Sequence, residues 1–230
     1  MFPSPKRSDR AFFSFFALYY LVTMTVAFTR STAQVISEQG GLRTIAIVHS
    51  VLGTIWLALY VTQTLLIRGE RRRLHERLGI AGVPVMVGVF ITGVLAVLRL
   101  HLPLEELPAQ LVRSELALFT LALIYAVMGI ANRSEAAAHK RYMLMSMVLL
   151  SPAGMGRLLI SMGFQVPDDL LVFLLVIFAI PLLSILVYDL VAYRKVCRAT
   201  WVGLLLYIVH LVVGPSWGAL IVDHIRPLLA

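Results

Sequence analysis

The sequence predicts an all-α membrane protein that crosses the bilayer several times, and three observations carry this prediction. Of the 230 residues, 60% are hydrophobic, and the mean hydropathy is +0.88; lipid accepts so much apolar surface, whereas a soluble fold of this length could not hide it. Seven apolar stretches reach the length of a bilayer span, which is roughly 20 residues. Fourteen of the twenty Lys and Arg residues lie in four short segments between these stretches. We therefore expect one transmembrane domain over residues 1–230, folded as a seven-helix bundle.

The predicted spans follow one another with short connections, which favours antiparallel neighbours in a single bundle. The first span follows a basic segment but lacks a small-residue cleavage site, so we expect it to be retained rather than removed as a signal peptide. Prolines inside the third, fifth, sixth and seventh spans are expected to kink those helices and to free a carbonyl in each. In order, the spans are 11–28, 44–67, 79–100, 113–131, 139–162, 169–192 and 200–222.

The distribution of basic residues predicts how the bundle lies in the membrane. The four basic segments all fall on the same side when seven spans alternate, and the positive-inside rule places that side in the cytoplasm. We expect a multi-pass protein of the bacterial inner (cytoplasmic) membrane, with its N-terminus inside and its C-terminus outside. The net charge of +8 then meets anionic headgroups of the lipid bilayer, and nucleic acid is not an expected partner. These segments are Lys6–Arg10, Arg68–Arg77, Arg133–Arg141 and Arg194–Arg198.

Polar side chains inside the spans carry most of the functional information, because they are costly in lipid. Three spans align polar or small residues at helical spacing, so each is expected to turn that face into the bundle. In addition, Gly214-x-x-x-Gly218 matches the small-residue pattern of close helix packing. The three faces are His49, Gly53, Trp56, Tyr60 and Gln63 in span two; His139, Met143, Ser146, Leu150, Ala153 and Arg157 in span five; and Gly203, His210, Gly214 and Trp217 in span seven.

Two histidines near the inner face could ligate a b-type haem. Haem iron takes two neutral imidazoles, needs an apolar slot, and needs basic groups for its propionates. His75 opens span three and His139 opens span five, both at the cytoplasmic side. The basic side chains expected near them are Arg72, Arg77, Lys140 and Arg141.

A second pair could do the same near the outer face. His49 and His210 would supply the imidazoles, and Arg157 would be a propionate or polar partner. With four candidate haem-iron or metal ligands, the leading functional prediction is a redox protein that moves electrons across the membrane, with haem b as its possible cofactor. Its partner would be a redox protein or a larger membrane complex, and no catalytic residue can be assigned.

Two other interpretations of the protein's function remain open. Histidines among charges at an interface are commonly headgroup contacts, and a buried histidine can be satisfied by a hydrogen bond to Gln63 or Tyr60. The protein would then be a non-catalytic membrane subunit or scaffold. Alternatively, Arg157, His210 and Gln63 would form the buried polar path of a small-molecule or proton carrier. Asp189, at the inner end of span six, is expected to pair with Arg194 or with the basic segment before span five.

Four short blocks resemble a widespread group of uncharacterised bacterial integral membrane proteins. The blocks are His49-Ser-Val-Leu-Gly53, Leu74-His75-Glu-Arg-Leu-Gly79, His139-Lys-Arg-Tyr-Met143 and Tyr188-Asp189-Leu190. The resemblance runs from span two through span six and implies an inner cluster of His75, His139 and Asp189, but no activity. Members of the group often carry a histidine shortly after the last block, where Cys197 stands here. A fainter similarity, in layout only, is to transmembrane di-haem cytochromes b.

Overall fold

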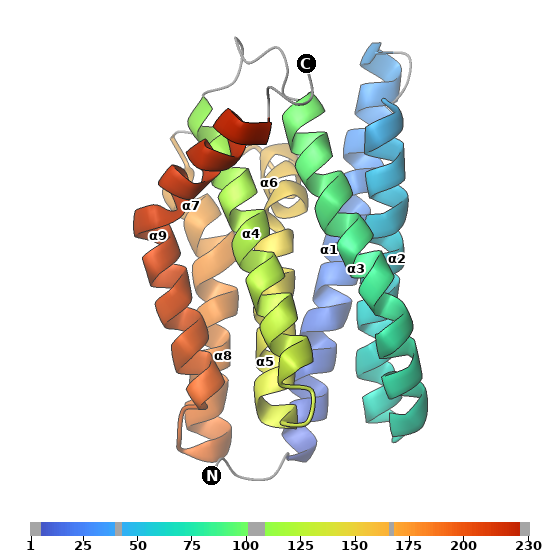
Figure 1. The fold of residues 1–230 in the computed structure, drawn as a ribbon, viewed down its shortest axis with the longest axis vertical. Helices are drawn as coiled ribbons and strands as arrows, with labels where there is room; N and C mark the ends of the chain where they lie inside the picture. The colour runs from blue at the N-terminus through green and yellow to red at the C-terminus, as the bar shows by residue number, and fades with distance from the viewer. Residues whose placement is uncertain (1–5, 40–42, 101–108, 166–167, 226–230) are drawn as a thin grey trace.

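A computed structural model describes residues 6–39, 43–100, 109–165 and 168–225 of the chain, and every regular element among them is helical. The helices stand side by side as an elongated bundle (Figure 1), which confirms the predicted all-α class. The two chain ends, whose sides of the membrane the sequence also predicts, lie outside the described residues. The elements are α1 (Arg7–Gln39), α2 (Thr44–Arg68), α3 (Arg72–Leu100), α4 (Ala109–Ala131), α5 (Ala136–Leu150), α6 (Pro152–Ser161), α7 (Leu170–Leu174), the π-helical η1 (Leu175–Ala179), α8 (Ile180–Tyr193) and α9 (Arg198–Ile225).

Most of the predicted membrane spans correspond to helices of sufficient length and apolar character. Within the described ranges, five helices could cross a membrane: Arg7–Gln34, Thr44–Arg68, Arg72–Leu98, Arg113–Ala131 and Leu170–Tyr193. A sixth results if the bent pair α5 and α6 forms one span, whereas the described apolar part of α9, Arg198–Gly214, is shorter. The chain is therefore a multi-pass helical membrane protein with five or six candidate spans. The seventh span, at 200–222, stays a prediction.

The span predicted at 139–162 is broken between α5 and α6, whose axes differ by 49°. Pro152 causes the break, because it has no N–H to donate and its ring clashes with the preceding turn. Ser151 instead bonds only three residues back, its N–H and its hydroxyl both donating to the carbonyl of Val148 at 3.2 and 2.7 Å. The polar face predicted along this span therefore ends at the bend: Ser146 is fully buried, but Arg157 is exposed. The shared face of His139 and Arg157 predicted from helical spacing is interrupted by this bend, and Arg157 stays a prediction as a site residue.

The span predicted at 169–192 is continuous but irregular. It is built from α7, η1 and α8, with Pro181 at the start of α8. Proline has no N–H to donate, so it interrupts the regular hydrogen bonds of an α-helix. In the π-helical turn directly before Pro181, each amide bonds five residues back instead of four, which lets the helix continue past the proline. The span keeps its full length, Leu170–Tyr193.

Two antiparallel hairpins organise the bundle. Helices α2 and α3 pack closely, as do α4 and α5, and α9 packs on α4. Glycines on α3 allow the close approach to α2: a Cβ at Gly88 would lie 3.2 Å from a methyl group of Leu52, and one at Gly82 would overlap Leu59. The direct contact between the hairpins, through α3 and α4, is looser. At the centre of the bundle stands α5, in which every side chain from Leu144 to Leu149 is buried.

The packing of α9 on α4 predicts the effect of one small substitution. A Cβ at Gly218 would overlap the backbone carbonyl of Arg113, which no side-chain movement can relieve. We expect Gly218→Ala to lower the free energy of unfolding by about 1–3 kcal/mol, measured by thermal unfolding in detergent. Gly53→Ala is the matched control, since a Cβ there meets nothing within 4 Å and Ala is the better helix former. Equal unfolding temperatures for the two variants would contradict this packing.

Candidate functional site

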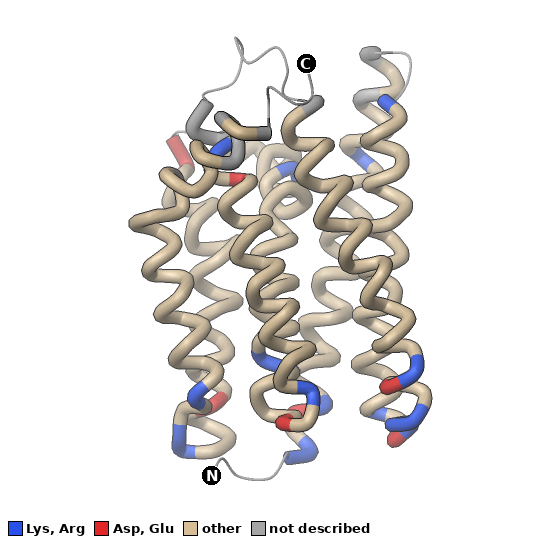
Figure 2. The backbone as a smooth tube through the Cα atoms, in the orientation of Figure 1, with Lys and Arg blue, Asp and Glu red and all other residues tan. Residues whose placement is uncertain are grey.

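Most charged residues gather at one end of the bundle (Figure 2). This end, called the basic end here, is formed by the start of α1 and by the α2–α3, α4–α5 and α8–α9 turns. The four basic segments found in the sequence all meet there. The opposite end carries a few scattered basic residues, namely Arg30, Arg43, Arg113 and Arg157.

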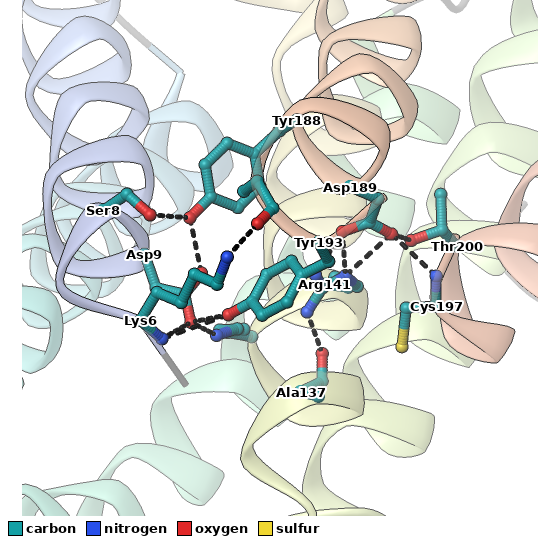
Figure 3. A network of polar contacts seen from close by, with 12 residues as sticks. Lys6, Ser8, Asp9, Ala137, Arg141, Tyr188, Asp189, Tyr193, Cys197 and Thr200 are labelled. Carbon is teal, nitrogen blue, oxygen red and sulfur yellow. Dashed lines mark hydrogen bonds and ion pairs between the residues drawn. The ribbon is translucent and has the colours of Figure 1, made fainter. Parts of the chain in front are cut away.

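A fully buried ion pair joins α5 to α8 at the basic end. Arg141 and Asp189 form it, and both side chains are 0% exposed. Arg141 Nε donates to Asp189 Oδ1 at 3.0 Å, and Nη1 donates to the carbonyl of Ala137 at 2.7 Å. The other carboxylate oxygen of Asp189 accepts from the Cys197 N–H at 2.9 Å and from the Thr200 hydroxyl at 2.6 Å (Figure 3). One carboxylate thus ties together α5, α8 and the start of α9.

The partner of Asp189 comes from one of the two places that the sequence suggested. Arg141 is the last residue of the basic segment before span five. Arg194, the other suggested partner, is exposed and takes the left-handed conformation (φ 53°) that ends α8.

A second buried carboxylate holds the start of α1. Asp9 is only 5% exposed and forms an ion pair with Lys140 of α5. Its carboxylate accepts from the hydroxyls of Tyr188 at 2.5 Å and Tyr193 at 2.6 Å, and from the N–H of Lys6 at 3.1 Å (Figure 3). Because both tyrosines belong to α8, this cluster fixes α1 against α5 and α8.

Most of the basic groups that were predicted to bind haem propionates already take part in ion pairs within the protein. Lys140 pairs with Asp9, Arg141 with Asp189, and Arg72 with Glu76 at 2.8 Å. Of the four predicted groups, Arg77 alone has no ion-pair partner in the described part of the chain.

The structure brings together the predicted inner histidine pair. His75 lies near the start of α3 and His139 near the start of α5, with ring centroids 6.1 Å apart and ring planes at 87°. His139 Nδ1 lies 2.8 Å from the backbone carbonyl of Gly129 in α4. A histidine that donates from Nδ1 to a carbonyl has its Nε2 lone pair available, which is the usual arrangement of a metal-binding histidine.

Three buried polar atoms beside this pair have no hydrogen-bond partner: Nδ1 of His75 and both amide atoms of Gln63. The Gln63 side chain lies over Gly79, its Nε2 only 3.5 Å from where a Cβ would stand. An unpaired buried polar group costs about 1–3 kcal/mol, and such groups in folded proteins are normally paired. This corner of the basic end is therefore where a ligand would find unused donors and acceptors.

A metal at this corner would need ligands beyond protein side chains. Among the residues that the structure describes, no group of three or more His, Cys, Asp or Glu side chains is placed to hold a metal ion. The four-ligand protein cage of a structural zinc site is therefore not formed by this part of the chain. Two imidazoles are sufficient only where another molecule completes the coordination.

The predicted outer pair is not brought together. His49 on α2 lies 3.1 Å from the Thr92 hydroxyl and edge-on to Phe119, whereas His210 on α9 stacks on Tyr207 with ring centroids 6.3 Å apart. Helices α2 and α9 stand on opposite sides of the bundle (Figure 1). Each histidine therefore has local neighbours, and the two share no site.

Arg157 does not complete an outer site or a buried path. Its guanidinium donates to the Ala153 carbonyl at 2.8 Å and lies 5.4 Å from the centre of the Phe28 ring. Arg157, His210 and Gln63, the predicted carrier path, belong to α6, α9 and α2, and within the described residues no hydrogen bond joins any two of them. Of the span-two face, Tyr60 is buried with 7% exposure.

Comparisons with known proteins give no assignment: the chain matches no family model, no curated protein and no solved structure. The resemblance found in the sequence is thus not accompanied by a family identification. The chain is established as a multi-span helical membrane protein.

The sequence did not reveal several residues that shape the basic end or contact a candidate histidine. Asp9 had a signal, because it is the one acidic residue within the first basic segment. Thr92, which faces His49, is the one hydroxyl-bearing residue of the predicted span 79–100. Tyr193 and Thr200 had no comparable signal, since their roles depend on the turn that brings α9 back against α8.

The buried pair predicts a strong effect on stability. Removing one partner leaves an uncompensated buried charge, so Arg141→Met should lower the free energy of unfolding by about 3–5 kcal/mol. Adding Asp189→Asn should recover part of this loss, because the neutral amide oxygen can still accept from Cys197 and Thr200. Unfolding in detergent of both single variants and the double variant measures the coupling.

Arg72→Gln serves as the control, because the Arg72–Glu76 pair is largely exposed, at 82% and 55%, and should contribute little. Additive effects of Arg141→Met and Asp189→Asn, or a loss no larger than that of Arg72→Gln, would rule out the buried pair as a main stabilising contact.

Proposed function

We propose that this protein is a membrane redox protein that binds a haem, or another metal cofactor completed by outside ligands, through His75 and His139 at the basic end. The observation that carries the proposal is the approach of two imidazoles from different helices, 6.1 Å between ring centroids, beside three buried polar atoms without partners. Haem supplies reversible one-electron chemistry when bound.

The geometry of the pair fits ligation from two sides. An imidazole nitrogen binds a metal at roughly 2.0 Å, so two such nitrogens across one metal are about 4 Å apart. The ring centroids are 6.1 Å apart, which leaves room for a metal between the two imidazoles. Haem needs only two protein ligands, since the porphyrin supplies the other four. That requirement agrees with a site that offers two imidazoles and no third metal-ligating side chain from the described residues.

A cofactor held by this pair would lie between the two hairpins. His75 and His139 belong to different hairpins, and these meet through the looser α3–α4 contact. His139 is already oriented by the Gly129 carbonyl. Arg77 is the remaining basic group of the predicted set for a cofactor carboxylate.

A non-catalytic membrane subunit is the second candidate. The observation that favours it is the buried network around Asp9 and Asp189, in which each carboxylate forms an ion pair with a residue of another helix. Such a network stabilises a bundle without performing chemistry. The two candidates differ in whether the purified protein carries a cofactor.

We expect the protein, expressed with ample haem, to show Soret and alpha bands in its reduced-minus-oxidised spectrum. His75→Ala and His139→Ala should each abolish the signal, because each removes one of the two iron ligands. His224→Ala is the control and should leave the spectrum unchanged, since His224 is exposed near the end of α9. A flat spectrum for the folded protein, with no stoichiometric metal by elemental analysis, would favour the non-catalytic subunit.

We also propose that α9 crosses the membrane, giving seven spans with the N-terminus in the cytoplasm and the C-terminus outside. Alkaline phosphatase, which is active only outside the cytoplasm, should be active when fused after Ala230. Green fluorescent protein should fluoresce when fused at Lys195, in the basic α8–α9 turn. A fluorescent, phosphatase-negative C-terminal fusion would mean that α9 does not cross.

A further inference from the structure

The turn between α2 and α3 concentrates positive charge that the protein itself does not neutralise. Both of its carboxylates are already paired, Glu70 with Arg10 at 2.9 Å and Glu76 with Arg72 at 2.8 Å. The other four arginines of the turn are exposed and have no ion-pair partner within the described ranges. They are Arg68, Arg71, Arg73 and Arg77. The turn thus presents several free guanidinium groups within ten residues of chain.

An open cavity of about 710 Å³ lies at this turn, lined by Glu70, Arg71, Arg72, Arg73, Leu74 and Glu76. It is an open surface hollow rather than an enclosed pocket. Consecutive arginines on the wall are suited to phosphate oxygens, because each guanidinium can donate two parallel hydrogen bonds. The start of α3 adds the positive end of its helix dipole at the same place.

Exposed apolar side chains lie near the cavity on both helices of the hairpin. Leu74 is 41% exposed and Ile80 is 76% exposed, both on α3, and Ile67 at the end of α2 is 39% exposed. These residues stand where the candidate spans Thr44–Arg68 and Arg72–Leu98 meet the basic end. A ligand in the cavity would therefore have its polar part at the arginines and an apolar part against the outer face of the hairpin.

We infer that the α2–α3 turn binds an anionic phospholipid, with its phosphate held by Arg71 and Arg73 and its acyl chains along Ile80, which lies two turns beyond Arg73 on the same face of α3. Only a lipid uses both features of the site, since a soluble phosphate would contact the arginines and leave the apolar surface unused. Each basic residue near a membrane surface adds a favourable interaction with anionic lipid. The inference concerns the α2–α3 turn and does not depend on cofactor binding by the histidine pair.

The test is native mass spectrometry of the full-length protein, delipidated in detergent and titrated with phosphatidylglycerol or with phosphatidylcholine of the same acyl chains. The wild-type protein should retain phosphatidylglycerol in preference. The double variant Arg71→Gln/Arg73→Gln should lose that preference, with its phosphatidylglycerol affinity reduced about tenfold or more. The control Arg133→Gln/Lys195→Gln removes the same charge from two exposed positions in other turns of the basic end and should bind as the wild type does.

Three results would overturn the inference. Equal retention of the two lipids by the wild type would show that the turn does not select anionic headgroups. An equal loss in the control variant would show a general effect of charge rather than a site. Displacement of the lipid by glycerol phosphate at similar concentration would show that the apolar contacts add nothing and that the site takes soluble anions.

Both double variants retain His75 and His139, so a redox spectrum can be recorded on the same samples. Failure of the lipid proposal is therefore distinguishable from failure of the cofactor proposal.

Discussion

The buried ion pair between Arg141 and Asp189 is the contact on which the basic end of the bundle depends. Two charges without solvent are stable together only when their hydrogen-bonding groups are also satisfied. Here Asp189 receives the guanidinium, a backbone amide and a hydroxyl, and Arg141 donates to Asp189 and to the Ala137 carbonyl. Those contacts fix the position of α5 against α8 and the start of α9, which apolar contacts alone define less closely, because the hydrophobic effect has no direction.

The direction of the candidate ligand His139 follows from this arrangement. Three consecutive residues of α5 point about 100° apart around the helix axis, as 3.6 residues per turn requires. Arg141 reaches Asp189 in α8, Lys140 reaches Asp9 in α1, and His139 lies beside Gly129 of α4 and His75 of α3. Ion pairs on two sides of α5 prevent its rotation, and so they hold the imidazole toward the other hairpin. The structural network and the candidate site are thus parts of one arrangement.

The sequence was sufficient for features that depend on length, composition and distance from the membrane surface. The all-α class, the clustering of the four basic segments and the approach of His75 to His139 all follow from such features, because both histidines open spans at the same end. The sequence was insufficient for features that depend on which helices are neighbours in the bundle. Depth alone suggested pairing His49 with His210, but the order of the helices separates them. Spacing along a straight helix suggested an inward Arg157, but Pro152 bends the helix before that residue is reached.

The site also lies where two hairpins meet less closely than each packs within itself. His75 and Gln63 belong to the α2–α3 hairpin, whereas His139 belongs to the α4–α5 hairpin, and these hairpins pack more closely within themselves than against each other. Among the described residues, Asp189 and Arg141 are fully paired on the α5–α8 side, whereas Nδ1 of His75 and the amide of Gln63 have no partner. A ligand held by both imidazoles would pair these atoms and join the hairpins, so its binding and their association are thermodynamically linked. For this reason the contact between the two hairpins, rather than the most buried charges, is the place at which a cofactor would change the protein most.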